Sequence, residues 1–63
     1  MFIEVTLFYT QKKAMLNVTY IEQFSESRET LTGTEIWMTT DPDGDPYEVS
    51  ESYLDICHML GLK

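Results

Sequence analysis

Apolar and polar residues alternate along much of this 63-residue chain, a pattern typical of short strands with one buried face. The alternation is clearest over residues 2–9, 20–24 and 34–40. Shorter apolar stretches at residues 14–16 and 47–49 fit the same period. The pattern therefore predicts four to five short strands, and the strand at 34–40 has the strongest signal.

Polar segments separate these stretches and predict the turns. Residues 11–13 read as a hairpin turn, and Asn17 and Thr19 compete for backbone hydrogen bonds in a second turn. Residues 25–33 form a polar loop in which Leu31 is the candidate anchor. Residues 41–46, with the sequence DPDGDP, predict a hairpin because glycine accepts positive φ and proline is excluded from central strands.

A short amphipathic helix is predicted at the C-terminal end. Ser52 and Asp55 have the spacing of a capping box, and Gly61 is well placed to end the helix. The predicted buried stripe follows helical spacing and comprises Tyr53, Ile56, Cys57 and Leu60. The sequence thus predicts one α+β domain over residues 1–63, a small twisted antiparallel β-meander with one C-terminal amphipathic helix.

The period of two also assigns side chains to faces. In the strand at 34–40, Ile36 lies on one face, whereas Glu35 and Trp37 lie on the other. Trp37 is expected opposite Tyr47 across the hairpin. An aromatic cluster rimmed by acids is typical of a protein-binding hot spot. The alternative, that Trp37 is a core residue, stays open because the sequence does not say which face the helix covers.

The charge of the chain is strongly acidic. Four basic residues face eleven acidic ones, for a net charge of −7, and no Lys or Arg occurs from Glu29 to Leu62. Direct binding to nucleic acid or to an anionic membrane is disfavoured because both need basic side chains. A basic protein surface is the natural electrostatic partner, although an acidic surface can also serve only solubility.

Catalytic and metal chemistry is not indicated. Asp41, Asp43 and Asp45 lack the glycine position and final glutamate of a calcium-binding loop, so no metal or other cofactor is expected. Cys57 and His58 are neighbours on a helix and cannot face each other, so they do not form a nucleophile–base pair. Cys57 is predicted to be a core residue and His58 to be exposed. The predicted class is a non-enzymatic protein.

Acidic and aromatic residues around the last hairpin are the candidate partner-binding site. They are Glu35, Trp37, Asp41, Asp43, Asp45, Tyr47 and Glu48. A chain this short sits near the limit of stability, and one cysteine permits no internal disulfide. Self-association, most simply as a homodimer, is therefore also expected. The free thiol and the absence of a signal-peptide pattern predict a cytoplasmic protein.

The order of these motifs resembles the small flagellar-operon FlbD proteins and similar short phage-encoded proteins. The matching positions are Ile3, Val5, Thr6, Leu16, Asn17, Ile21, Glu22, Tyr47, Val49, Glu51 and Ser52. The match covers most of the chain, but these positions are structural, so the resemblance implies no functional residue. The DPDGDP segment replaces the simpler glycine-centred turn of the family, a departure that favours the phage-type branch.

Two functions follow as hypotheses. The first is a phage or mobile-element inhibitor that occupies a basic surface of a host nucleic-acid-handling or defence complex. The second is a self-associating structural or regulatory accessory protein of flagellar type, whose acidity serves only solubility. The second predicts an oligomer built through Phe2, Phe8 or an exposed edge strand.

Overall fold

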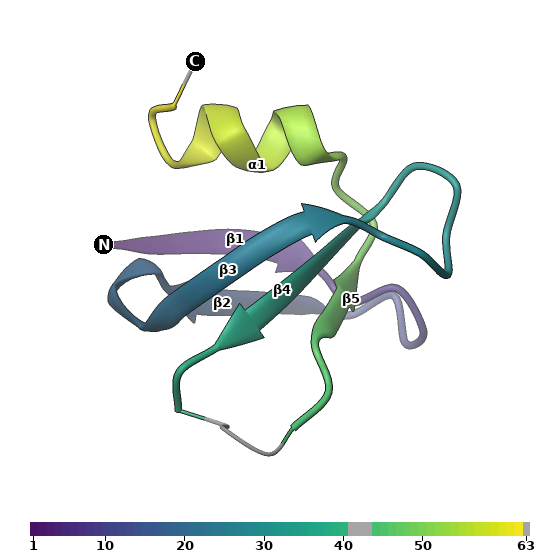
Figure 1. Cartoon of the computed structure of the whole chain (residues 1–63), viewed down its shortest axis with the longest axis horizontal. Helices are drawn as coiled ribbons and strands as arrows, with labels where there is room; N and C mark the ends of the chain where they lie inside the picture. Colours follow the sequence, from purple (N-terminus) through teal and green to yellow (C-terminus); the bar gives the residue numbers. More distant parts are fainter. Residues whose placement is uncertain (41–43, 63) are drawn as a thin grey trace.

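The computed structural model describes residues 1–40 and 44–62 of the chain. Five short strands are followed by a C-terminal helix (Figure 1). The elements run in the order β1 (Phe2–Thr6), β2 (Lys13–Asn17), the 3-10 helix η1 (Val18–Tyr20), β3 (Ile21–Glu26), β4 (Thr34–Met38), β5 (Tyr47–Val49) and α1 (Tyr53–Met59). The predicted α+β class is therefore confirmed.

The strands form two antiparallel sheets, β1–β2 and β3–β4–β5. The sheets meet where the chain leaves β1, because Leu7 pairs with Val49 in an isolated bridge. The Phe8 N–H also donates to the Glu48 carbonyl at 2.8 Å. In the described residues β2 and β3 are not paired, so the meander is interrupted at η1.

The first strand is shorter than its alternation predicts. β1 ends at Thr6 and only the single bridge at Leu7 continues it. Beyond that point the chain turns, and Gln11 adopts a positive φ of 59°. Tyr9, which shares the alternation of the buried residues Ile3 and Val5, is 67% exposed. Alternation in the sequence marks residues that can form a strand. The strand itself extends only as far as a neighbouring strand pairs with it.

A bulge breaks the alternation of β3. The register with β4 shifts between Ile21 and Gln23. Such a shift inserts one unpaired residue and changes which side chains share a face. As a result Ile21 and Phe24 both pack against the core, although strict alternation would place residues 21 and 24 on opposite faces.

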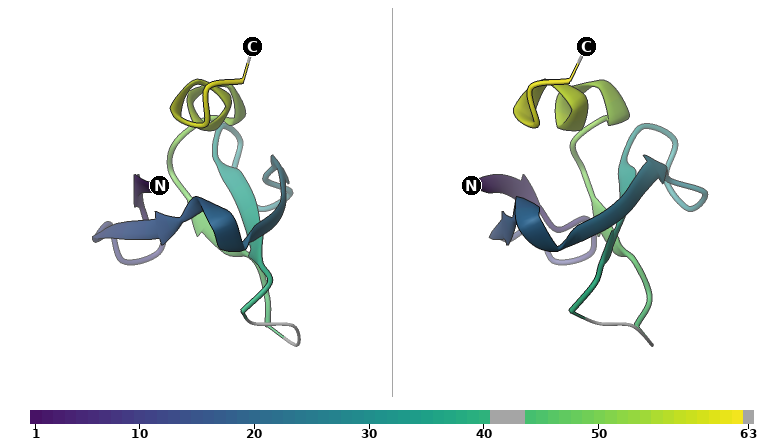
Figure 2. Two further views of the ribbon diagram at one scale, coloured as in Figure 1. Left: turned by 90° about the vertical axis from the view of Figure 1, so that its left-hand side faces the viewer. Right: turned by 60° about the vertical axis from the view of Figure 1, so that its left-hand side comes forward.

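The core lies between the two sheets and α1, which covers both sheets from one side (Figure 2). Its buried side chains come from β1, β2, β4, β5 and α1 and are Ile3, Val5, Leu16, Ile36, Val49 and Ile56. The buried Thr34 hydroxyl near it donates to the Glu51 carbonyl at 2.8 Å. The Glu51 carboxylate in turn accepts from the Thr6 N–H at 2.8 Å and joins β1 to the segment before α1.

Both predicted ends of the helix are confirmed. The Asp55 N–H donates to Ser52 Oγ at 3.1 Å, and the Ser52 N–H donates back to Asp55 Oδ2 at 3.3 Å, which is a complete capping box. At the other end Gly61 has φ of 77°, and the Leu62 N–H donates to the Cys57 carbonyl at 2.8 Å, as in a Schellman motif.

The predicted helical stripe is correct at its centre and wrong at its first member. Ile56 and Cys57 are buried, and Cys57 is a free thiol, whereas His58 is exposed as expected. Tyr53 is 42% exposed, with its ring centroid 5.2 Å from that of Phe24. Among the described residues no helix is long and apolar enough to cross a membrane.

Candidate functional site

Two glutamates face each other across β4 and β5. Glu35 and Glu48 are cross-strand partners, on the side of the sheet away from Ile36. Glu35 is only 1% exposed, and Glu48 is half-buried. The expectation that Glu35 lies on an outward surface is therefore wrong. Alternation assigned its face correctly, but a loop covers that face.

The covering loop is the segment 27–33 between β3 and β4. The Ser27 N–H donates to the Gly33 carbonyl at 3.0 Å and closes the base of the loop. Ser27 Oγ accepts from the N–H groups of Glu29 and Thr30 and donates to Glu48 Oε1 at 2.5 Å. One serine side chain thus both shapes the loop and fastens it to β5.

Glu35 is held in its charged form by the same loop. The Arg28 N–H donates to Glu35 Oε2 at 3.0 Å, and Arg28 Nε lies 3.4 Å from the same oxygen. The backbone hydrogen bond is the largest cause that lowers the pKa of Glu35, and the guanidinium charge acts in the same direction against the effect of burial.

The pKa of Glu48 is shifted in the opposite direction to that of Glu35. Burial is the largest cause that raises the pKa of Glu48, and the neighbouring charges of Glu35 and Glu29 raise it further. The hydrogen bond from Ser27 partly offsets these effects. The two facing carboxylates therefore differ in pKa. Glu35 stays charged to a lower pH, and Glu48 retains its proton to a higher pH.

Trp37 and Tyr47 do not face each other. Tyr47 pairs with Ile36, and Trp37 pairs with Gln23 of β3. Opposite residues of an antiparallel pair share a face, so Tyr47 lies on the face of Ile36 and Trp37 lies on the face of Glu35. Trp37 is half-buried, and Tyr47 is 43% exposed at the edge of the sheet. The predicted aromatic pair is thus absent, because the register is one residue away from the expected one.

A different aromatic residue lies beside Tyr47. A mainly apolar hollow of about 230 Å³ is lined by Leu7, Tyr9, Pro46, Tyr47 and Glu48 among others. A polar hollow of about 280 Å³ lies next to it and shares Tyr9, Pro46 and Glu48. We call six of the residues that line these two hollows the tyrosine–acid surface; they are Tyr9, Glu29, Asp45, Pro46, Tyr47 and Glu48. Leu7, Thr10 and Arg28 also line the hollows and are exposed or half-buried.

Tyr9 belongs to this surface through a contact distant in sequence. Its hydroxyl donates a hydrogen bond to Glu29 Oε2 across a separation of 20 residues. This hydrogen bond is the largest cause that raises the pKa of Tyr9. The sequence offered no signal for the pair, because the turn after β1 and the loop 27–33 come together only in the folded chain.

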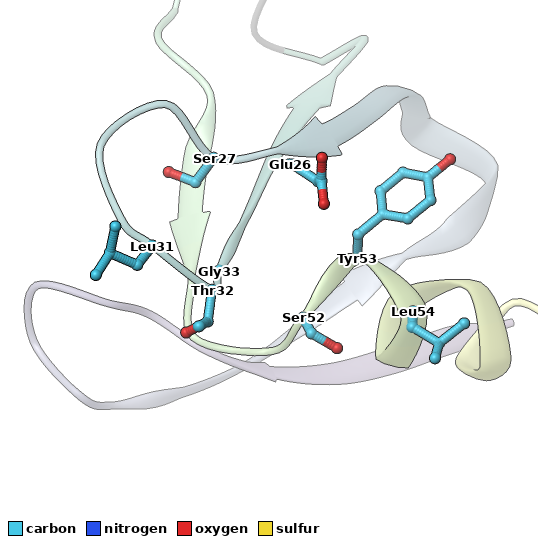
Figure 3. Close-up of a pocket in the computed structure, with 8 residues that line it drawn as sticks. All are labelled: Glu26, Ser27, Leu31, Thr32, Gly33, Ser52, Tyr53 and Leu54. Carbon is cyan, nitrogen blue, oxygen red and sulfur yellow. The ribbon is translucent and has the colours of Figure 1, made fainter.

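Four further residues singled out from the sequence lie in the predicted loops. Asp45 is exposed two residues before β5, whereas Asp41 and Asp43 lie outside the described residues. Leu31 is not an anchor, since its side chain is fully exposed. In the hollow of about 470 Å³ between this loop and α1, Leu31 points away from Glu26 and Tyr53 (Figure 3).

Within residues 1–40 and 44–62, no group of three or more His, Cys, Asp or Glu side chains could hold a metal ion. Comparison of the chain with protein-family models, with curated proteins and with solved structures finds no match. The resemblance to FlbD-type proteins therefore stays a prediction.

Proposed function

We propose that this chain is a small acidic, non-enzymatic protein-binding module that occupies a basic surface of another protein. The observation that carries the proposal is the tyrosine–acid surface, which places two exposed tyrosines and a proline among three acidic side chains. Tyrosines supply contact area at small conformational cost, and acidic residues around them favour a basic partner.

The arrangement of charge supports this choice of partner. Among the described residues that line the two hollows, Arg28 is the one basic residue, and its Nε lies 3.4 Å from Glu35 Oε2. The polar hollow adjoins four carboxylates, those of Glu29, Glu35, Asp45 and Glu48. With a net charge of −7, the chain would be steered toward a positive surface at low ionic strength.

The target class that we propose is a nucleic-acid-handling or defence complex of a bacterial host. Such complexes carry basic grooves, and a compact acidic chain is suited to block one as a phage or mobile-element inhibitor in the host cytoplasm. This part of the proposal rests on the net charge and on the resemblance to short phage proteins.

The test is a pull-down from bacterial lysate at low and high salt, comparing the wild-type chain with the double variant Asp45→Asn, Tyr47→Ala. We expect the wild-type chain to capture a basic protein that is released by salt and lost with the double variant. The matched control is Glu4→Gln, Met15→Ala on the outer face of β1–β2, which should retain the partner. Capture that is equal for all three chains, or insensitive to salt, would contradict the proposal.

Self-association is the second candidate function. Phe2 is 58% exposed, and Phe8 is 38% exposed. An accessory protein that assembles through these side chains would form a stable oligomer whose assembly is weakened by Phe2→Ser. Sedimentation velocity at micromolar concentration distinguishes the two functions, because the inhibitor does not require an oligomer and the accessory protein does.

A further inference from the structure

A groove runs between β3 and α1, at the edge of the sheet opposite β5. One part of it, of about 480 Å³, is lined by Ile21–Phe24 of β3 together with Tyr53, Leu60 and Leu62. The hollow of about 470 Å³ in Figure 3 extends it along the strand, since it shares Tyr53 and includes Glu26. Together the two hollows are lined by Ile21–Phe24 and by Glu26 of β3.

The groove exposes the backbone edge of the strand. The four consecutive residues that line the groove include two that pack against the core, Ile21 and Phe24, and two that are exposed, so the groove follows the edge of the strand and not one face. Within the described residues β3 pairs only with β4. Its other edge therefore presents N–H and C=O groups that another strand can pair with.

The opposite wall of the groove is apolar and partly exposed. Tyr53 and Leu62 are 42% and 50% exposed, and Leu60 is half-buried. Tyr53 packs beside Phe24, with the ring centroids 5.2 Å apart. A strand seated against β3 would place alternate side chains on these residues, which is how edge-strand addition beside a helix obtains specificity.

The geometry points to an extended peptide segment of a partner protein as the occupant, added as a strand to β3, with basic residues alternating with apolar ones. Glu22 and Glu26 are exposed on β3, and this strand carries no Lys or Arg. A second copy of the chain paired along the same edge would bring these acidic strands and two net charges of −7 together. A basic strand would be attracted by the same charges.

This inference rests on the proposed function for the basic character of the partner, but it concerns a different surface. The probe is a fluorescein-labelled peptide of about eight residues, long enough to cover β3, in which Lys or Arg alternates with Val or Ile. We expect the peptide to bind and to protect the backbone amides of β3 from hydrogen exchange. N-methylation of its alternate backbone amides should weaken binding by about tenfold or more, because the strand hydrogen bonds are lost.

Two variants separate the surfaces. Glu22→Lys, Glu26→Lys should weaken peptide binding, whereas Asp45→Asn, Tyr47→Ala should leave it unchanged. Equal binding of the N-methylated peptide, no binding of either peptide, or protection that maps to the tyrosine–acid surface would overturn the inference. If the lysate partner depends on Asp45 and Tyr47 while β3 binds no peptide, the proposed function stands and the β3 groove is not a docking site.

Discussion

The two faces of the β3–β4–β5 sheet are both covered, but by different means. One face presents Thr34, Ile36 and Val49 to the core, and all three side chains have no exposed area. The other face presents Glu35 and Glu48, which the loop 27–33 covers with its own hydrogen-bond donors. The first face is buried because its side chains avoid water. The second can be buried because hydrogen-bond donors of the loop take the place of water around its two carboxylates.

The comparison shows that burial alone does not identify a core position. Glu35 is as inaccessible as its neighbour Ile36, yet it depends on Arg28 and on a correctly folded loop. A buried carboxylate without these donors would be strongly unfavourable. The apolar face should therefore dominate stability, and the polar face should dominate the dependence of stability on pH.

The largest expected effect is on the apolar face. Ile36→Ala removes a fully buried side chain and should lower the free energy of unfolding by about 2–5 kcal/mol, which could unfold so small a domain. Urea denaturation followed by circular dichroism measures it. The matched control is Leu31→Ala at a fully exposed side chain, which should change stability little. Similar losses for both variants would contradict the assignment of the core.

Next in size is a substitution at the base of the covering loop. A Cβ atom on Gly33 would lie 2.3 Å from the Val49 carbonyl oxygen and 2.6 Å from Thr30 Oγ1, so Gly33→Ala forces the backbone to move. We expect a loss of about 1–3 kcal/mol, together with faster exchange of the Ser27 amide, whose acceptor is the Gly33 carbonyl. Thr32→Ala, at an exposed position of the same loop, is the control.

A third test acts on the charged member of the facing pair. Glu35→Ala should destabilise the fold by about 1–3 kcal/mol near neutral pH, because the Arg28 N–H loses its acceptor. The folded-state pKa of Glu35 is lowered, so its contribution is present above the unfolded pKa of about 4.3 and is lost as pH falls through the lower folded value. Glu35→Ala should therefore differ most from wild type above that range, and stability measured from pH 2 to 7 would show it. If the variant and the wild type differed in stability by the same amount at every pH, Glu35 would not be charged in the folded state.

The smallest effect should have the opposite sign. Glu48→Gln keeps an oxygen that can accept from Ser27 Oγ and removes the charge that opposes Glu35. Because the folded-state pKa of Glu48 is raised, its favourable contribution is present below the unfolded pKa of about 4.3 and is lost as pH rises through the folded value. The variant should gain about 0.2–1 kcal/mol over wild type at neutral pH and nothing in acid. The control Glu22→Gln, on the exposed part of β3, should gain less stability at neutral pH. An equal gain would mean that the stabilisation comes from the reduced net charge alone.

Much of the fold could be predicted from local patterns. Strong alternation identified β4, the cap and the final glycine identified α1, and the turn residues identified most of the connections. These signals come from residues close in sequence, so no tertiary information was needed to interpret them. The failures came from how the strands pair with one another. A bulge in β3 reversed the face of Phe24, and the register of β4 with β5 displaced Tyr47 from Trp37.

The candidate site could be predicted only in part. The sequence alone determined the acidic charge, the composition of the last hairpin and the face on which Glu35 lies. Only the tertiary structure decided that the loop 27–33 covers that face, that Tyr9 reaches Glu29, and that β3 keeps a free edge beside α1. The physical reason is that periodicity reports which side chains share a face. What covers a face depends on contacts between residues that are far apart in the chain.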